Sequence, residues 1–343
     1  NDFDTLQVDL FKNMEIVSIK KSGNNLSFYR KHNAVFIEMP DMKKDSLFEI
    51  TIQYEGLPEE AKNPPWDGGF VWDEDKNETP FIGVACEGTG ASLWWPNKDH
   101  PSDEPDSVRL HITVPDTLVA IGNGRLESIE KTDSTSTYTW LVKNPINNYN
   151  ITLNIGDYTE ISDTLINSSG VQKLNHYVLS YNKEIALRYF PQVREVIHFF
   201  EKIFGEYPFW DDGYKLIETP YAGMEHQSGI AYGNGYITSG HYYIYDLVDY
   251  IILHETAHEW WGNSLTSCDG ADVWIHESFA TYSEVLYLEE KLGKLISIDY
   301  LIKKRKHIQN KLPIVGPQHV NYWGFDDVYW KGAWVIHTLR FVI

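Results

Sequence analysis

Two histidines, His254 and His258, lie four residues apart in the stretch HETAHEWWGN at positions 254–263, and Glu255 follows the first of them. Side chains four apart on a helix share one face, with Cβ atoms roughly 5–6 Å apart. The two imidazoles can therefore bind one zinc ion, each at about 2.0–2.1 Å. Glu255 lies at the flank of the pair, where a base for a zinc-activated water belongs. The pattern predicts a metal centre that performs hydrolysis.

A catalytic zinc site has three protein ligands and one open position. Glu277 is the candidate for the third ligand, because it follows His258 after a crossing loop and the first turn of a second helix. His276 is a rival, but its side chain leaves that helix about 100° away from Glu277. Glu284 lies two turns further along the same face. It either orients a ligand or is an ordinary surface glutamate, and both interpretations stay open.

The elements that must position these residues change type along the chain. Residues 1–182 alternate apolar and polar side chains between Gly, Asn and Pro, which predicts a β-rich N-terminal domain. Residues 183–343 carry apolar side chains at helical spacing, which predicts a mainly helical domain. Within it, helices over 246–263 and 274–293 would carry the zinc ligands. The stretch 56–106, rich in Trp, Gly, Pro and acids, predicts long irregular structure of the kind retained for a site. The fold class is therefore α+β.

Composition excludes several kinds of partner. The net charge of −20 argues against nucleic acid, because phosphate binding requires a basic surface. No apolar stretch is long enough for a membrane span, and no CxxC pair offers a cysteine zinc site. The compartment stays open: exported or periplasmic if a signal peptide was removed before the first residue, and cytoplasmic otherwise.

Four motifs, in order along the chain, resemble those of one enzyme family. The HExxH motif followed after 18 residues by Glu is similar to the zinc signature of the M1 aminopeptidases. These are gluzincins and include leukotriene A4 hydrolase and aminopeptidase N. AGMEH at 222–226 resembles the family motif G-x-M-E-N, and YWKGA at 329–333 resembles Y-x-K-G-A. CEGTGASLWWPNKDHPSDEP at 86–105 resembles a segment of the family's N-terminal domain.

The resemblance implies a saddle-like antiparallel β domain without its first strands, followed by a thermolysin-like zinc domain. It also implies that the chain is truncated and lacks a further C-terminal domain of the full-length protein. One zinc ion per chain is expected on His254, His258 and Glu277, with Tyr329 as the catalytic tyrosine and Tyr322 as its nearest alternative. The residues that the resemblance assigns to substrate binding are Glu87, Gly223, Met224 and Glu225.

The expected activity is removal of the N-terminal residue from peptides. A zinc-activated water would attack the first carbonyl, Glu255 would act as general base, and Tyr329 would stabilise the carbonyl oxygen. Two alternatives remain: an epoxide hydrolase of the leukotriene A4 hydrolase type, and a non-catalytic binding module, which would be marked by loss of a ligand or the base. His226, His276 and Ser278 replace the usual family residues, which leaves the subfamily and pocket shape open.

An aminopeptidase must also recognise a free N-terminus. Glu87 and Glu225, from different domains, are expected to bind the substrate's α-ammonium group, because charge-assisted hydrogen bonds to a carboxylate are about twice as strong as neutral ones. The tryptophan- and proline-rich loops at 64–72 and 94–105 are expected to close the cleft behind it. Peptides with a free N-terminus are therefore the predicted partners.

Overall fold

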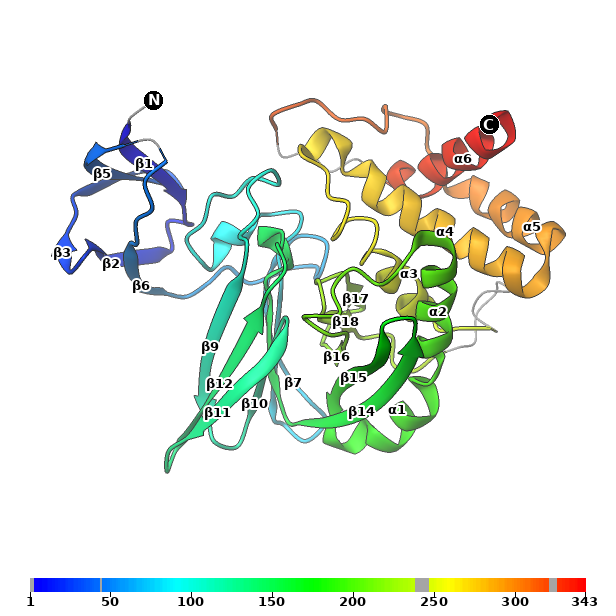
Figure 1. The fold of residues 1–343 in the computed structure, drawn as a ribbon, viewed down its shortest axis with the longest axis horizontal. Helices are drawn as coiled ribbons and strands as arrows, with labels where there is room; N and C mark the ends of the chain where they lie inside the picture. The colour runs from blue at the N-terminus through cyan, green and yellow to red at the C-terminus, as the bar shows by residue number, and fades with distance from the viewer. Residues whose placement is uncertain (1–2, 44, 238–246, 321–325) are drawn as a thin grey trace.

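Strands occupy the chain up to residue 179 and helices dominate after residue 182 (Figure 1). The computed structural model describes residues 3–43, 45–237, 247–320 and 326–343. The first strands are β1 (Phe3–Asp9), β2 (Met14–Lys21), β3 (Asn24–Asn25), β4 (Phe28–Lys31), β5 (Ala34–Met42), β6 (Thr51–Gly56), β7 (Gly69–Glu74) and β8 (Pro80–Ala85). The later strands are β9 (Val108–Pro115), β10 (Val119–Gly122), β11 (Arg125–Lys131), β12 (Thr135–Val142), β13 (Leu153–Gly156), β14 (Tyr158–Asn167), β15 (Gly170–Leu179), β16 (Leu216–Glu218), β17 (Gly223–Met224) and β18 (Ile230–Tyr232). The helices are α1 (Lys183–Tyr189), α2 (Gln192–Phe204), α3 (Tyr250–Ala257), α4 (Trp274–Leu292), α5 (Lys294–Lys304) and α6 (Asp327–Val342). The predicted α+β class is confirmed.

The N-terminal part consists of antiparallel sheets. β1-β5-β4 and β3-β2-β6 form two three-stranded sheets that enclose a core of their own, and they lie at one end of the molecule (Figure 1). β11-β12-β9 and β10-β13-β8-β7 follow toward the helices. Alternating apolar side chains give each sheet one buried face, as in β12, where every second residue from Ser136 to Val142 is buried.

The prediction of irregular structure over 56–106 was wrong in part. β7 and β8 lie inside this stretch and pair from Gly69↔Ala85 to Glu74↔Pro80. Phe70 and Val84 are buried in the cluster that borders the site, and this burial outweighs the strand-breaking composition around them. The remainder of the stretch, including Pro64–Gly68 and the segment after Ala85, lacks extended secondary structure.

A five-stranded mixed sheet leads from the β-rich part to the helices. Its order is β14-β15-β16-β18-β17, with β15, β16 and β18 mutually parallel. This sheet includes two strands from before residue 182 and three from after it, so the two parts are joined by backbone pairing. The boundary at residue 182 stays a prediction.

The helical part begins with two short helices. Pro191 separates α1 from α2, because proline has no N–H to continue the first helix. One predicted helix is shorter than expected. α3 spans Tyr250–Ala257 rather than the whole of 246–263, and residues 238–246 lie outside the described part of the chain. Gly262, at φ +128°, permits the reversal that follows α3.

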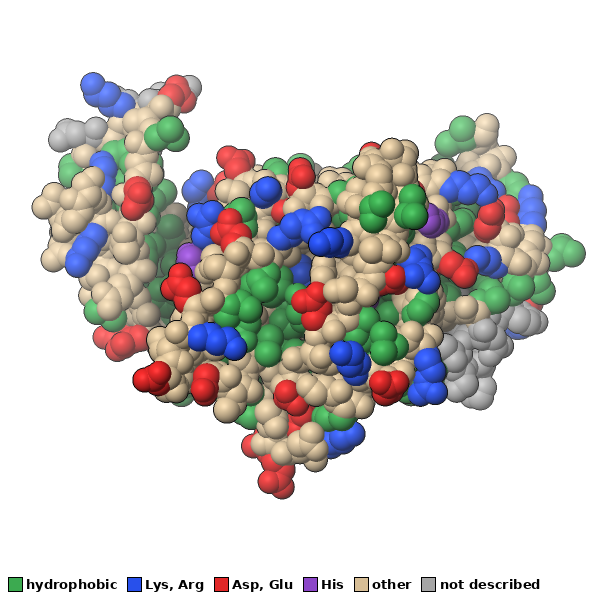
Figure 2. Space-filling view, turned by 60° about the horizontal axis from the view of Figure 1, so that its bottom comes forward, with side chains coloured by type: hydrophobic (Ala, Val, Ile, Leu, Met, Phe, Trp, Pro, Cys, Tyr) green, Lys and Arg blue, Asp and Glu red, His purple; other side chains and the backbone are tan. Residues whose placement is uncertain are grey.

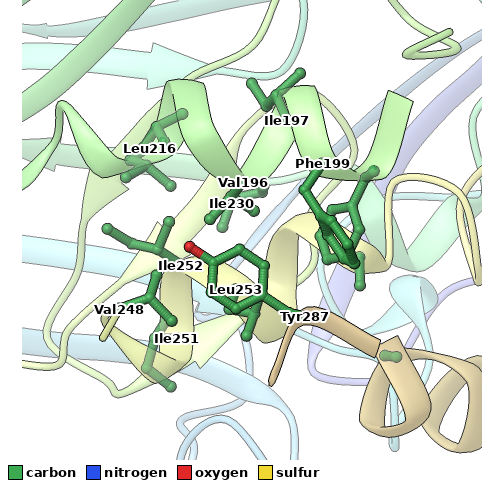
Figure 3. Packing of buried hydrophobic residues seen from close by; sticks show 14 of the residues in the cluster. Val196, Ile197, Phe199, Leu216, Ile230, Val248, Ile251, Ile252, Leu253 and Tyr287 are labelled. Atoms are coloured by element: carbon green, nitrogen blue, oxygen red, sulfur yellow. The ribbon is translucent and has the colours of Figure 1, made fainter. Parts of the chain in front are cut away.

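α3 lies in the centre of the helical part and is buried on all sides. Apolar side chains from α2, β16, β18 and α4 surround its residues Ile251, Ile252 and Leu253 (Figure 3). A helix that is apolar all round belongs inside a protein, and any polar group on it requires a partner. His254, the histidine on this helix, is therefore surrounded by packed side chains, and its ring nitrogens need polar partners.

The surface is mixed in charge. On the face shown in Figure 2, Lys and Arg side chains are interspersed with Asp and Glu. In the described part of the chain, none of the helices has the length and apolar character needed to cross a membrane.

Candidate active site

The three predicted zinc ligands come together at the end of α3 and the start of α4. His254 lies in the last turn of α3, which Asp249 caps by accepting a hydrogen bond from the Ile251 N–H at 3.0 Å. His258 directly follows the helix and keeps helical dihedral angles. Glu277 lies in the first turn of α4. All three ligand side chains are buried.

Their ligand atoms have the spacing of a tetrahedral metal site. Nε2 of His254 lies 3.3 Å from Nε2 of His258 and 3.3 Å from Oε2 of Glu277, and the third separation is 3.5 Å. Ligand atoms 2.0–2.1 Å from one tetrahedral ion are about 3.3 Å apart. Two imidazoles and one carboxylate, with a cleft on the open side, suit zinc. The residues present therefore fit the metal that the sequence predicts.

Hydrogen bonds on the outer side orient both imidazoles. His254 Nδ1 lies 2.8 Å from a carboxylate oxygen of Glu284, and His258 Nδ1 lies 2.9 Å from the carbonyl oxygen of Trp261. Each Nδ1–H can donate outward, which leaves the Nε2 lone pair free for a metal. Glu284 is fully buried and also accepts a hydrogen bond from Tyr300. The structure therefore decides between the two readings of Glu284: it is not a surface residue.

Electrostatics also favour a cation here. Burial lowers the pKa of His258, but the carboxylates of Glu225 and Glu277 outweigh burial and raise this pKa to about 9. Burial likewise opposes ionisation of Glu277, yet His258 and His254 hold the pKa of this carboxyl below its usual range. The same negative charge that raises the pKa of His258 would stabilise a dication bound between these side chains.

A second set of ligand atoms overlaps the first. Glu225, Glu255 and His258 also bring their ligand atoms within 4.8 Å of one another. That set lacks His254, whose Nε2 lies within 3.5 Å of both other members of the first set. The first set is therefore the more compact of the two and fits a single ion better.

Glu255 lies on the cleft side of the ligand pair. Burial raises the pKa of its carboxyl to about 7, although the two histidines act in the opposite direction. Its Oε1 approaches Gly223 so closely that a Cβ there would lie only 2.8 Å away. Gly223 therefore gives Glu255 the space that its carboxylate occupies.

Replacing Gly223 with Ala should displace Glu255. The new Cβ would lie 2.8 Å from both Glu255 Oε1 and Ile251 Cγ2, which is closer than real Cβ contacts. A displacement near 1 Å at a reacting group can reduce turnover by about 100-fold. We expect Gly223→Ala to keep its zinc and lower kcat by about 10- to 100-fold in a peptidase assay.

The matched control for this prediction is Gly229→Ala. A Cβ at Gly229 meets nothing closer than 3.5 Å, so this variant should retain turnover. An equal loss of kcat in both variants would show that this segment tolerates no added methyl group. The loss in Gly223→Ala could then not be attributed to displacement of Glu255.

Tyr329 lies in the first turn of α6, next to His254. The two rings are stacked with centroids 6.1 Å apart and an interplanar angle of 25°. Burial raises the pKa of the Tyr329 phenol well above its usual value, and the charge of Glu277 adds to this shift. The phenol therefore stays protonated and can donate a hydrogen bond. Tyr322, the alternative, lies outside the described residues.

The two predicted anchor carboxylates meet in the same cleft. Glu87 follows β8, and Glu225 follows β17. Burial raises the pKa of the Glu87 carboxyl well above its usual value, and the neighbouring charge of Glu225 raises it further. The cleft has a volume of about 210 Å³. Its lining includes all the predicted site residues: Glu87, Gly223, Met224, Glu225, His254, Glu255, His258, Glu277 and Tyr329.

The two loops expected to close the cleft behave differently. Pro65 and Trp66, from the first loop, line the cleft as predicted. The prediction for 94–105 was wrong for this cleft, because its lining residues Asp99, His100 and Pro101 belong to a neighbouring cavity of about 340 Å³. The two cavities share Glu87. In the neighbouring cavity, the carboxylate of Asp99 already accepts hydrogen bonds from two backbone N–H groups.

The structure adds two tyrosines that the sequence did not single out. Tyr149 donates a hydrogen bond to Glu225 Oε1 at 3.1 Å, and no local pattern marked it. Tyr250 stacks on His254 at 5.4 Å, and its position one turn before His254 could have indicated this. His276 is turned away from the ligands, since its Nε2 accepts a hydrogen bond from the Ser267 N–H.

Comparisons with known proteins agree with this geometry. Residues 190–343 match the family model described as Peptidase family M1 domain. Leucyl aminopeptidase of Saccharolobus solfataricus is 24% identical over 99% of this chain and 43% of its own length. Leucine aminopeptidase 2 of Aspergillus oryzae is 30% identical over 60% of this chain and 32% of its own length. The chain thus spans less than half the length of these curated relatives.

Solved structures show the same fold. The M1 zinc metallopeptidase from Deinococcus radiodurans superposes with a TM-score of 0.80 at 20% identity, over 99% of this chain and 75% of that one. A mutant of that enzyme bound to a Tyr-Ser-Ala substrate also gives a TM-score of 0.80, at 19% identity over the same shares of the two chains. Residues 190–343 therefore match a peptidase family M1 domain, and the chain as a whole is similar in sequence to aminopeptidases and in fold to M1 zinc metallopeptidases.

Proposed function

We propose that the chain is the catalytic part of a zinc aminopeptidase, which removes the first residue from peptides with a free N-terminus. One observation carries the proposal. The ligand set of His254, His258 and Glu277 and the two carboxylates of Glu87 and Glu225 line a single cleft of about 210 Å³. A zinc site alone would not distinguish a terminal peptide bond from an internal one. Two carboxylates beside it would favour substrates whose free N-terminus carries an ammonium group.

Each residue has a task that its position supports. A bound zinc ion would acidify a water molecule and draw charge from a substrate carbonyl. Glu255 accepts the proton of the attacking water and returns it to the departing amine. The Tyr329 hydroxyl donates a hydrogen bond to the carbonyl oxygen as negative charge develops, a contribution of about 2.7–4 kcal/mol for one such donor. The curated relatives and the neighbour bound to a tripeptide support this reaction class.

The free N-terminus is recognised by Glu225 and Glu87. Tyr149 donates to one oxygen of Glu225, and Asn263 donates to the backbone oxygen of Glu225 at 2.8 Å, so this carboxylate is held in place. An internal peptide nitrogen has no charge and would leave both acids without a cationic partner in a buried cleft. That cost selects against endopeptidase activity.

The two earlier alternatives are less well supported. The described residues contain both the zinc ligand set and a candidate base, whereas a binding module would be marked by their loss. None of the described contacts favours an epoxide over a peptide.

Glu225→Ala tests the anchor. On substrates with a free α-amine, we expect kcat/KM to fall by about 100-fold or more, because a charge-assisted bond in a buried site is lost. On N-acetylated versions of the same substrates, the variant should match the parent. Zinc content and melting temperature should stay near parental values.

Two outcomes would contradict the anchor. One is an equal loss on free and acetylated substrates, which would assign Glu225 to folding or chemistry. The other is efficient cleavage of acetylated peptides by the parent protein, which would indicate an endopeptidase. Glu225→Gln serves as a control, because it keeps the size of the side chain and an oxygen for the Tyr149 hydroxyl but removes the charge.

A further inference from the structure

Ser278 is the residue of α4 directly after the ligand Glu277. It is fully buried, and its hydroxyl donates a hydrogen bond to the carbonyl oxygen of Val328 in α6 at 2.5 Å. Val328 directly precedes Tyr329 in the chain. One hydrogen bond therefore joins the side chain of the residue after Glu277 to the backbone of the residue before Tyr329.

This carbonyl group is accessible because of Gly332. In a helix, the side chain four residues later lies beside the carbonyl group of residue i, so Gly332 leaves the carbonyl of Val328 uncovered. A Cβ at Gly332 would lie 1.6 Å from the Ser278 hydroxyl oxygen and 2.6 Å from its Cβ. The Ser278 side chain therefore occupies the space that a side chain at position 332 would need.

Among the described residues, three other polar contacts join α4 to α6 further from the cleft. The Tyr282 hydroxyl lies 3.1 Å from His337 Nδ1 and accepts a hydrogen bond from the Arg340 guanidinium at 3.5 Å, and Arg340 also pairs with Glu289 at 2.7 Å. These contacts hold the two helices together along their length. The Ser278 contact differs from them because it lies next to Tyr329, in the first turn of α6.

We propose that Ser278 is a positioning residue that sets where the Tyr329 phenol lies relative to Glu277 and the metal site. The proposal rests on the proposed function, since it requires Tyr329 to act on the substrate carbonyl. A hydrogen bond to developing charge depends steeply on distance and angle. Without the Ser278 bond, the first turn of α6 can shift and the phenol loses its alignment. The metal ligands, which lie on α3 and α4, stay in place.

The test is a double-mutant cycle in the full protein chain. Ser278→Ala should lower kcat by about tenfold while KM stays within about twofold and zinc content is unchanged, the pattern of a group that acts in the transition state. Tyr329→Phe should lower kcat by about 100-fold. In the Tyr329→Phe background, Ser278→Ala should have almost no further effect on kcat, because there is no hydroxyl left to align.

Tyr282→Phe is the matched control. It removes a buried hydroxyl from the same helix interface, so it should lower the melting temperature to a similar extent as Ser278→Ala but leave kcat unchanged. A second variant separates the hydroxyl from packing. Ser278→Gly combined with Gly332→Ala fills the groove from the other helix, since the Ser278 Cα lies 3.6 Å from the new Cβ. This double variant should recover the melting temperature that Gly332→Ala alone loses, while kcat stays at the Ser278→Ala level.

The outcomes distinguish a failure of the role proposed for Tyr329 from a failure of the role proposed for Ser278. If Tyr329→Phe keeps parental kcat, the role of Tyr329 in the proposed function is wrong. If Tyr329→Phe loses kcat but Ser278→Ala lowers it by the same factor in both backgrounds, Ser278 acts on stability alone and the positioning role is wrong. An unchanged kcat in Ser278→Ala overturns the inference as well.

Discussion

Glu255→Gln should bind zinc like the parent and lose nearly all turnover. The amide keeps the size of the carboxylate and its place beside Gly223, but it cannot accept a proton from water. Positioned general bases contribute about 10²–10⁴-fold to rate, so we expect kcat to fall by that factor. Steady-state hydrolysis of an amino-acid p-nitroanilide measures the loss of turnover, and zinc analysis of the same sample measures the retention of the metal.

A shorter acid provides the control for this result. Glu255→Asp keeps the carboxylate but withdraws it by one methylene group, so its kcat should lie between the parent and the amide variant. Parental turnover in Glu255→Gln, within about tenfold, would assign the base to another group. The nearest such candidate is Glu225, which forms a second ligand-like set with Glu255 and His258.

His258→Ala should lose the metal altogether. The variant removes one of the three expected ligands, the imidazole whose Nδ1 lies 2.9 Å from the Trp261 carbonyl oxygen. The two expected ligands that remain do not make a zinc site. Elemental analysis should show less than about a tenth of the parental zinc content, and activity should fall with it. Added zinc should raise the melting temperature of the metal-free parent but not of the variant, because only a protein that binds zinc gains stability from it.

Three further variants make the ligand assignment specific. His276→Ala alters a buried histidine next to Glu277 that bonds to Ser267, and it should keep its zinc. Glu277→Ala should lose the metal, whereas Glu225→Ala should keep it. If Glu225→Ala lost the metal and Glu277→Ala kept it, the ion would instead be bound by Glu225, Glu255 and His258.

The acidic character of the cleft connects metal binding with substrate choice. Glu87, Glu225, Glu255 and Glu277 all lie on its lining, and the described lining contains no Lys or Arg. Under the proposed function, such a site would attract a dication and the ammonium group of a substrate. The chain's overall charge of −20 has the same sign and would steer cationic peptides toward the cleft.

The sequence alone determined the parts of the site that depend on local spacing. A helical repeat of four brings His254 and His258 to one face, and the intervening loop and helix turn return Glu277 to them, so the proximity of these three side chains could be predicted without a structure. The α+β class could be predicted for the same reason, since periods of two and of 3.6 residues are local properties. Irregular composition over 56–106 concealed β7 and β8, because their burial depends on partners elsewhere in the chain.

Only the tertiary structure decided the contacts between distant segments. Tyr149 meets Glu225 across 76 positions, and Ser278 meets Val328 across 50. The structure also showed that Glu284, which the sequence left ambiguous, is buried against His254 and Tyr300. No spacing rule encodes such pairs. They follow from which sheet and helix faces pack together, and that packing depends on apolar surfaces contributed by the whole chain.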